Sequence, residues 1–275
     1  MRQDHYKMKD KVVIITGASS GIGKALAFET GARGAIVVLA ARSEQKLAEI
    51  ESQLSASGVR SLSVITDVSK EEDCKHLIDT TIEKFGRIDV LINNAGMSMR
   101  AIFEKTDLAV IHRLMDVNFW GTVYCTKYAL PWLLKSKGSL VGVSSIAGYK
   151  GLPGRTGYSA SKFAMQGFLE TLRIENIKKG LHVLIACPGF TSSNIRNTAL
   201  SADGSIQGES PRNEDSMMKP EKVAKKIVRA IESKQRILVM TMVGKWTVAL
   251  DKIFPFLMDR IVYNQMAKEP DSPFK

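Results

Sequence analysis

Short apolar runs alternate with longer amphipathic segments along most of the chain. The runs are rich in Val and Ile, which is typical of strands buried within a sheet. In the longer segments apolar residues recur every three or four positions, as on the buried face of an α-helix. The alternation predicts an α/β protein with a parallel sheet. We expect strands at 11–16, 35–41, 62–66, 88–92, 138–143, 181–186 and 236–241, and helices at 24–33, 43–58, 70–85, 106–134 and 220–233.

Length and composition indicate an ordinary globular chain. Its 275 residues, 44% of them hydrophobic, suffice for one large α/β domain or two small ones, and no low-complexity linker divides them. The three cysteines and four histidines are scattered, so we expect neither a disulfide framework nor a metal site. The polar N-terminus has no apolar core of a signal or membrane span, which predicts a cytoplasmic protein. A net charge of +11 comes without a nucleic-acid-binding motif, so we expect no nucleic-acid partner.

A glycine-rich turn joins the first expected strand to the first expected helix. Its sequence is Gly17-Ala-Ser-Ser-Gly21-Ile-Gly23. Glycines let the backbone approach a pyrophosphate closely, and the N–H groups that begin a helix attract its charge. Turns use glycine for other reasons as well, but the strand before and the helix after favour a dinucleotide site. The spacing differs from the common Gly-x-Gly-x-x-Gly fingerprint.

The second expected strand ends without the carboxylate that would bind the ribose 2′-hydroxyl of NAD. Arg42 follows that strand instead. Its guanidinium can pair with a 2′-phosphate, supported by Ser19 or Ser20, although an arginine after a strand is often only a surface residue. The sequence therefore predicts NADP. After the third strand, Asp67 and Val68 can lie along an adenine ring, or Asp67 can cap the next helix.

Tyr158 and Lys162 are spaced one helical turn apart, so both should project from one helix face. The pKa of a tyrosine is about 10, and a nearby ammonium lowers it by favouring the phenolate. This pair predicts a proton donor and acceptor, although the same spacing also arises by chance on exposed helices. Ser145 follows the fifth strand, and a glycine-rich loop leads from it to Tyr158. The hydroxyl and the phenol can therefore meet.

Further polar residues lie at the same edge, where ligands of an open parallel sheet bind. The turns after the fourth and sixth strands contribute Asn94, Ala95, Gly96, Pro188, Gly189 and Thr191. Asn118 is surrounded by apolar neighbours, and its amide must find partners. It either makes a structural hydrogen bond between helix and sheet or orders a water near the site. The irregular segment at 192–218 is typical of a lid or binding loop.

The tail from 243 to 266 mixes large apolar residues with Lys245, Lys252 and Arg260. These charges, together with Pro255, exclude a membrane-spanning helix. Three interpretations are open: an apolar flap over a substrate pocket, a subunit interface, or an interfacial helix that dips into a membrane surface, where its basic residues meet anionic lipid.

The motifs together resemble those of the compact short-chain dehydrogenases/reductases. They are Thr16-Gly17-Ala-Ser-Ser-Gly21-Ile-Gly23, Asn93-Asn94-Ala95-Gly96, Asn118, Ser144-Ser145, Tyr158-x-x-x-Lys162 and Pro188-Gly189, in family order and spacing over about residues 9–241. The resemblance implies a doubly wound Rossmann fold with a seven-stranded parallel sheet flanked by helices. Residues 1–242 would form the dinucleotide-binding and catalytic domain and 243–275 an apolar extension, in a homodimer or homotetramer. The implied cofactor-binding residues are Gly17, Ser19, Ser20, Gly21, Ile22, Gly23, Arg42, Asp67, Val68, Asn94, Ala95, Gly96, Tyr158, Lys162, Pro188, Gly189 and Thr191.

The implied reaction interconverts a carbonyl and an alcohol with NADP(H). Tyr158 would protonate the carbonyl oxygen while Ser145 holds it, and Lys162 would lower the tyrosine pKa and bind the nicotinamide ribose. Asn118 would support a water relay that returns the proton. Beyond Pro188-Gly189, the cofactor contact is open among Thr191, Ser192 and Ser193.

Apolar residues around the expected pocket favour a hydrophobic substrate, lipid-like or steroid-like. They are Met97, Met99, Ile146, Leu152, Phe190 and the tail. Two other functions are compatible with the same residues: a non-catalytic NADP-sensing or scaffold protein, and a membrane-surface protein whose tail supplies the main function. Sugar epimerases and dehydratases share the Tyr-x-x-x-Lys pair, but they usually need a longer C-terminal substrate domain.

Overall fold

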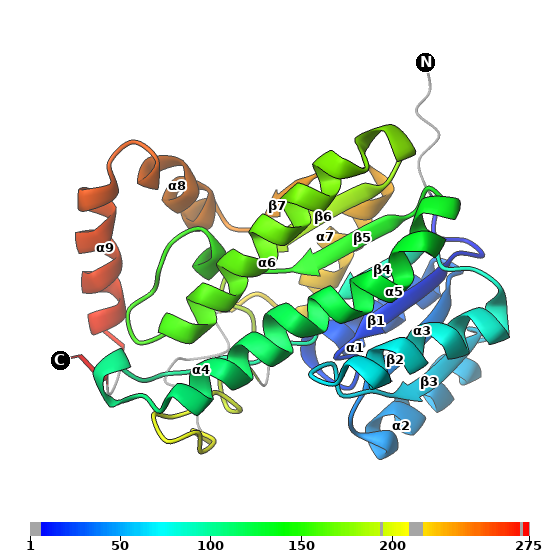
Figure 1. Cartoon of the computed structure of the whole chain (residues 1–275), viewed down its shortest axis with the longest axis horizontal. Coiled ribbons are helices and arrows are strands. Elements are labelled where there is room, and N and C mark those ends of the chain that lie inside the picture. Colours follow the sequence, from blue (N-terminus) through cyan, green and yellow to red (C-terminus); the bar gives the residue numbers. More distant parts are fainter. Residues whose placement is uncertain (1–6, 193–194, 209–216, 270–271, 275) are drawn as a thin grey trace.

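A seven-stranded parallel sheet forms the centre of the computed structural model, which describes residues 7–192, 195–208, 217–269 and 272–274 (Figure 1). The strands are β1 (Val12–Thr16), β2 (Ile36–Ala41), β3 (Ser61–Ile65), β4 (Val90–Asn93), β5 (Ser139–Val143), β6 (His182–Cys187) and β7 (Ile237–Val239). Their order is β3-β2-β1-β4-β5-β6-β7, so the direction of winding reverses between β1 and β4. This is the doubly wound Rossmann arrangement, and it places a ligand crevice at that reversal.

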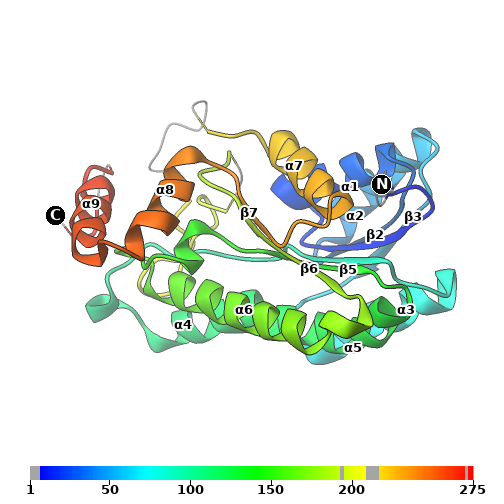
Figure 2. The same ribbon diagram turned by 90° about the horizontal axis from the view of Figure 1, so that it is seen from above.

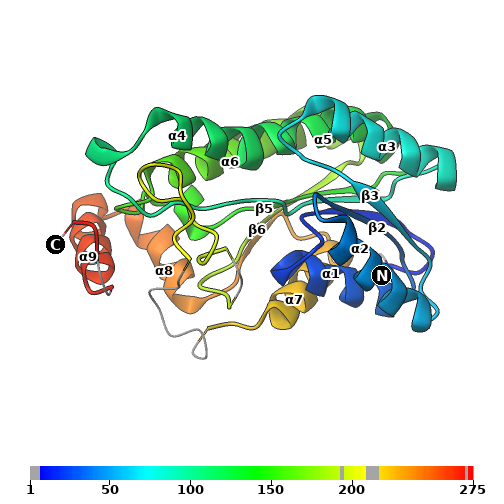
Figure 3. The ribbon, with the colours of Figure 1, turned by 90° about the horizontal axis from the view of Figure 1, so that it is seen from below.

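Helices cover both faces of the sheet (Figure 2). On one face lie α1 (Gly21–Ala32), α2 (Glu44–Ala56) and α7 (Pro220–Glu232). On the other lie α3 (Glu71–Phe85), α4 (Leu108–Met115), α5 (Gly121–Lys135) and α6 (Thr156–Glu175). Two further helices, α8 (Met242–Asp251) and α9 (Pro255–Ala267), stand together at one end of the molecule (Figure 3).

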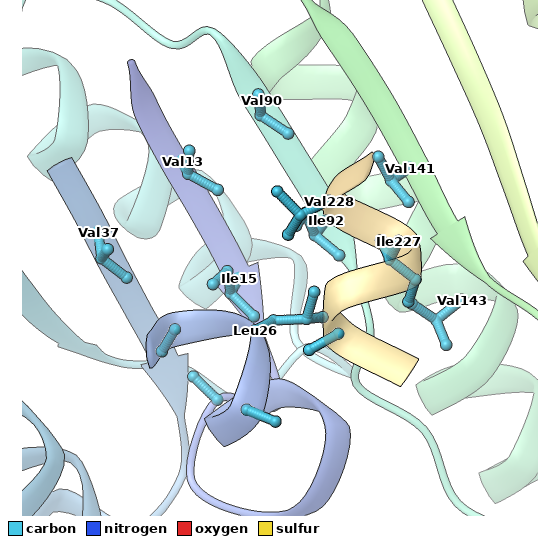
Figure 4. Packing of buried hydrophobic residues seen from close by; sticks show 14 of the residues in the cluster. Val13, Ile15, Leu26, Val37, Val90, Ile92, Val141, Val143, Ile227 and Val228 are labelled. Atoms are coloured by element: carbon cyan, nitrogen blue, oxygen red, sulfur yellow. The ribbon is translucent and has the colours of Figure 1, made fainter. Parts of the chain in front are cut away.

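The central strands β1 and β2 are buried at every position because each face of the sheet packs on helices. Side chains alternate between the two faces along a strand. Val13 and Ile15 of β1 therefore join the cluster that holds Leu26 of α1 and Ile227 of α7 (Figure 4), while Ile14 joins the cluster of the opposite layer. This explains why the sequence shows continuous apolar runs rather than an alternating pattern.

Two expected elements differ from the prediction. The strand expected at 236–241 covers only Ile237–Val239, because Thr241 leaves the sheet and caps α8, its hydroxyl accepting a hydrogen bond from Gly244 N at 3.1 Å. The helix expected at 106–134 is built from α4, a π-helical turn at Asp116–Trp120 and α5. Within the segment expected to be irregular, residues 195–208 form turns and isolated bridges.

Candidate active site

The glycine turn between β1 and α1 is compact because two of its residues lack a side chain. Gly17 has a φ of +65°, and a Cβ on it would lie 2.8 Å from the Ala95 Cα. A Cβ on Gly23 would lie 2.1 Å from the Gly17 carbonyl oxygen. Ser20 is the N-cap of α1, yet its hydroxyl makes no capping hydrogen bond and the first turn has no acidic side chain. These described residues leave the first N–H groups of α1 to a different acceptor, as an anion site requires.

Thr16, the last residue of β1, connects this turn to the turn after β4. Its hydroxyl oxygen accepts hydrogen bonds from Asn94 N and Ala95 N, both at 3.0 Å. The Asn94 side-chain amide in turn donates to the Thr16 carbonyl oxygen at 2.9 Å. The sequence analysis gave Thr16 no role, although its position directly before Gly17 was a usable signal.

Arg42 follows β2 and lines the same cavity as Ser19 and Ser20. It is exposed and forms no ion pair with a carboxylate among the described residues. Lys46, one turn into α2, lines this end too and was not predicted. The end of the cavity at β2 is therefore cationic.

Asp67 and Val68 lie after β3 on the cavity wall. The Asp67 carboxylate accepts from Ser69 N at 3.1 Å and from Ser69 Oγ at 2.7 Å, so it orders its own turn. It does not cap α3, whose N-cap is Lys70. The alternative of Asp67 as a helix cap is therefore wrong.

Ser145 and Tyr158 meet as the loop length predicted. Ser145 follows β5 and Tyr158 lies in the first turn of α6, and the two side chains are close enough that Ser145 lowers the pKa of the phenol. The Ser145 Oγ also accepts from Ala147 N at 3.2 Å, which fixes its orientation. A hydroxyl and a phenol thus face one point in the cavity that both line.

The predicted lowering of the tyrosine pKa is wrong for this structure. Burial raises the pKa of Tyr158, and the hydrogen bond with Ser145 and the charges of Arg155 and Arg196 only partly offset it. Lys162 is buried, with Nζ 5.9 Å from the centre of the Tyr158 ring, and it donates to the Val143 carbonyl oxygen at 2.9 Å. Burial lowers the pKa of Lys162 to about 8. Desolvation of the two groups therefore outweighs their attraction.

Asn118 lies in the π-helical turn, a deviation often found at functional sites. Its Oδ1 accepts from Met97 N at 2.8 Å, and its Nδ2 donates to Met97 O at 3.0 Å and to Ser161 Oγ at 2.9 Å. The fully buried amide thus joins the turn after β4 to α6. Asn118 therefore makes structural hydrogen bonds, and Ser161 of α6 is one of its partners.

The turn after β6 brings Pro188, Gly189 and Thr191 to the cavity. The Thr191 hydroxyl donates to the Gly189 carbonyl oxygen at 3.1 Å. Ser192 is not among the lining residues, and Ser193 lies outside the described residues. Among the described candidates, Thr191 is therefore the one placed for a cofactor contact.

Most of these groups line one cavity of about 1510 Å³, and its wall also includes Gly17, Gly21, Ile22, Asn94, Ala95 and Gly96. Two predicted residues, Gly23 and Asn118, are not part of its wall. Of the apolar candidates, Met97, Ile146, Leu152 and Phe190 line the cavity, as do several residues of α8 and α9. Met99 does not, because it is fully buried in a separate cluster with Val110 and Leu114.

Arg155 is a further wall residue that the sequence analysis missed. It directly precedes α6, is buried, and donates through Nη1 to Ser98 Oγ and to the Met99 carbonyl oxygen, both at 3.1 Å. Glu269, after α9, lies 4.0 Å from Arg155 and 3.7 Å from Arg100. Because these pairs join distant parts of the chain, no local pattern indicates them.

The residues of the cavity fit a nicotinamide dinucleotide. The close approach at Gly17 and Gly23, the uncapped start of α1 and the cationic end beyond β2 suit a pyrophosphate and a phosphorylated ribose. At the other end, Tyr158 and Ser145 stand beside Lys162. Residues 11–203 match the family model described as short chain dehydrogenase.

The chain belongs to the short-chain dehydrogenase family.

Curated relatives of this short-chain dehydrogenase are named for a steroid activity. It is 40% identical over 231 residues to "11-beta-hydroxysteroid dehydrogenase A" of Sesamum indicum, an alignment that covers 83% of this chain and 64% of the relative. It is 46% identical over 189 residues to "11-beta-hydroxysteroid dehydrogenase-like 2" of Arabidopsis thaliana, an alignment that covers 67% of this chain and 60% of the relative. The chain thus spans less than two thirds of the length of these relatives.

Solved structures share the fold of this short-chain dehydrogenase. A short-chain dehydrogenase/reductase from Burkholderia phymatum, in complex with NAD, has a TM-score of 0.82 at 25% identity and covers 92% of this chain, with 96% of its own chain matched. An alcohol dehydrogenase from the archaeon Thermococcus sibiricus, complexed with 5-hydroxy-NADP, has a TM-score of 0.73 at 29% identity. That alignment covers 84% of this chain and 94% of the other. Both of these solved structures hold a nicotinamide dinucleotide or a derivative of one.

Proposed function

We propose that this short-chain dehydrogenase interconverts a ketone and a secondary alcohol with NADP(H), using Tyr158 as the general acid and base. The observation that carries the proposal is that Ser145, Tyr158 and Lys162 line the same cavity as the glycine turn. A carbonyl oxygen placed between the two hydroxyls would receive one hydrogen bond from each.

A bound nicotinamide would supply the hydride. Tyr158 donates its phenolic proton to the carbonyl oxygen, and Ser145 stabilises the charge that develops there. The raised pKa of Tyr158 keeps the phenol protonated at neutral pH, which suits the reductive direction. Lys162 uses one of its three N–H donors on Val143, so the remaining donors can bind the ribose hydroxyls.

Asn118 supports this chemistry chiefly by position. Its amide fixes Met97 and Ser161, and its Oδ1 accepts one hydrogen bond where an amide oxygen has two lone pairs. We propose that the second lone pair serves the water relay that returns a proton to Tyr158. The residue is therefore assigned both to structure and to proton return.

The NADP preference is supported by the cationic end of the cavity. Arg42 and Lys46 line it together with Ser19, Ser20 and Ser43, and the residue directly after β2 is Arg42 rather than a carboxylate. A guanidinium and an ammonium beside three hydroxyls suit a 2′-phosphate, whereas NAD sites usually carry an acid there.

A hydrophobic substrate is supported by the apolar end. Met97, Leu152 and Phe190 line it, and the helices of the C-terminal extension close it with Met258 and Val262. The names of the curated relatives point to steroid-like ketones and alcohols, and we propose that substrate class for this chain.

A panel of ketones and aldehydes, followed by NADPH absorbance with NADH in parallel, tests the proposal. Turnover of bulky apolar ketones with NADPH preferred is the expected result. NADPH binding without oxidation of any NADPH across the panel would instead favour the non-catalytic sensor. The homodimer or homotetramer and the cytoplasmic location stay predictions.

A further inference from the structure

The C-terminal extension exposes an unusual amount of apolar side chain. Seven large residues of α8, α9 and the connection between them are more than half exposed: Met242, Val243, Trp246, Ile253, Phe254, Phe256 and Leu257. We call these residues the α8–α9 patch. Phe256 reaches 84% exposure and Val243 78%. Many exposed apolar side chains on two helices that contact each other are typical of an interaction surface.

The charges around the α8–α9 patch are mainly positive. Lys245, Lys252 and Arg260 are exposed on the same helices and their connection. The two acidic residues of this stretch, Asp251 and Asp259, both pair with Lys150, at 2.5 and 2.6 Å. Aromatic and aliphatic residues interspersed with lysine and arginine are the composition of a helix that lies in a membrane interface. Over the described residues, no helix is long and apolar enough to cross a membrane.

The α8–α9 patch shares a residue with the wall of the cavity. Val243 belongs to the patch and also lines the cavity, and Ile261, four residues after Leu257, is half exposed and lines the cavity too. The inward side of the same helices contributes Met258 and Val262 to the wall. Whatever covers the patch therefore contacts residues that also line the cavity.

We propose that the α8–α9 patch docks the protein onto an anionic lipid bilayer, so that apolar substrate enters the cavity from the membrane. The docking stands on exposure and charge alone, whereas the entry route rests on the proposed function. A second copy of the chain is the competing occupant. The bilayer is favoured because a rigid partner seated on Val243 and Ile261 would obstruct the opening, while fluid lipid covers the patch and leaves the opening accessible. Basic residues beside the patch also complement lipid headgroups.

Co-sedimentation with vesicles tests the docking without any assay of activity. The variant Trp246→Ser/Phe256→Ser removes two exposed rings that do not line the cavity. The matched control is Ile174→Ser/Ile177→Ser, which removes two side chains of 67% and 63% exposure, one in the last turn of α6 and one in the 3-10 turn that follows it. Vesicles of phosphatidylcholine alone are compared with vesicles that also contain phosphatidylglycerol.

The wild-type chain should bind the anionic vesicles more tightly than the neutral ones, and the preference should weaken with salt. The patch variant should bind at least about tenfold more weakly, and the control should bind as the wild type does. A second variant, Lys245→Gln/Arg260→Gln, should lose the preference for phosphatidylglycerol while keeping its thermal stability. Turnover of a water-soluble ketone by the patch variant should equal that of the wild type.

Three outcomes would overturn the docking. One is absence of wild-type binding to anionic vesicles at low salt, and another is equal binding by the patch variant and the wild type. The third is a patch variant that converts a dimer to a monomer, which would make the patch a subunit interface. Vesicle binding with no turnover of any substrate would leave the docking intact and remove the proposed function instead.

Discussion

Replacing Lys150 with methionine should loosen the C-terminal wall of the cavity. Lys150 belongs to the loop between Ser145 and Tyr158, and its ammonium lies 2.5 Å from the Asp251 Oδ1 and 2.6 Å from the Asp259 Oδ1. Asp251 is the last residue of α8 and Asp259 lies in α9. One cation therefore holds both helices against the loop between Ser145 and Tyr158. Methionine keeps the volume of the side chain and removes its charge. Two carboxylates would then face each other without a cation between them.

The size of the effect follows from the exposure of the three groups. The Lys150 side chain is only 11% exposed and that of Asp251 24%, whereas that of Asp259 is 65% exposed. Hydrogen bonds to charged groups contribute about 1.5–3 kcal/mol when buried, and exposed ion pairs contribute about 0.2–1 kcal/mol. The two ion pairs of Lys150 together stabilise the packing of α8 and α9 on this loop by about 2–3 kcal/mol. Because these ion pairs fix the helices that form the apolar wall, Lys150→Met should raise the KM for a bulky apolar ketone by about tenfold or more.

Steady-state kinetics and hydrogen exchange measure this change. The Kd for NADPH should stay within about twofold of the wild type, because the glycine turn and Arg42 lie at the other end of the cavity. Amide exchange should accelerate in α8 and α9 but not in the sheet. Lys127→Met is the matched control, since Lys127 is exposed on α5 and has no ion pair among the described residues. An unchanged KM together with unchanged exchange in α8 and α9 would refute the role given to Lys150.

Two further predictions concern the cofactor and pH. Arg42→Ala should weaken NADPH binding by about tenfold or more and NADH binding far less, because only NADPH carries the 2′-phosphate; equal losses in a fluorescence titration would contradict the assignment. Burial lowers the pKa of His182 to about 4. Between pH 6.5 and 4 the unfolded chain therefore binds a proton at this residue that the folded chain does not. The free energy of unfolding should fall as the pH falls through that window, by at most about 3 kcal/mol. Urea unfolding at several pH values should show a shallower dependence for His182→Asn, and an unchanged slope would remove this explanation.

Features fixed by local sequence were predictable. The seven strands follow from apolar runs, and the glycine turn follows from three glycines whose spacing only a tight strand-to-helix turn explains. Ser145 and Tyr158 were placed together because both lie at the carboxyl edge of the sheet and a short loop joins them. Each of these inferences needs only neighbouring residues and the rule that parallel strands end at one edge.

Features set by distant contacts were not predictable. Lys150 and Asp251 are 101 positions apart, and Arg155 meets Glu269 only after the extension has folded back on the cavity. The π-helical turn that carries Asn118 has no helical-period signature of its own. Burial raises the pKa of Tyr158 despite Lys162 in the next turn, because spacing along a helix says nothing of desolvation.

The central claim is that the Tyr158 phenol transfers the proton. Tyr158→Phe keeps the ring that packs beside Met99 and Leu114 and removes only the hydroxyl that lines the cavity with Ser145. A single-turnover measurement with bound NADPH and a reactive ketone, paired with a titration of NADPH affinity, isolates that proton. We predict a loss of about 10²–10⁴ in the rate with NADPH affinity nearly unchanged. A variant that reduces the ketone at the wild-type rate would contradict the account.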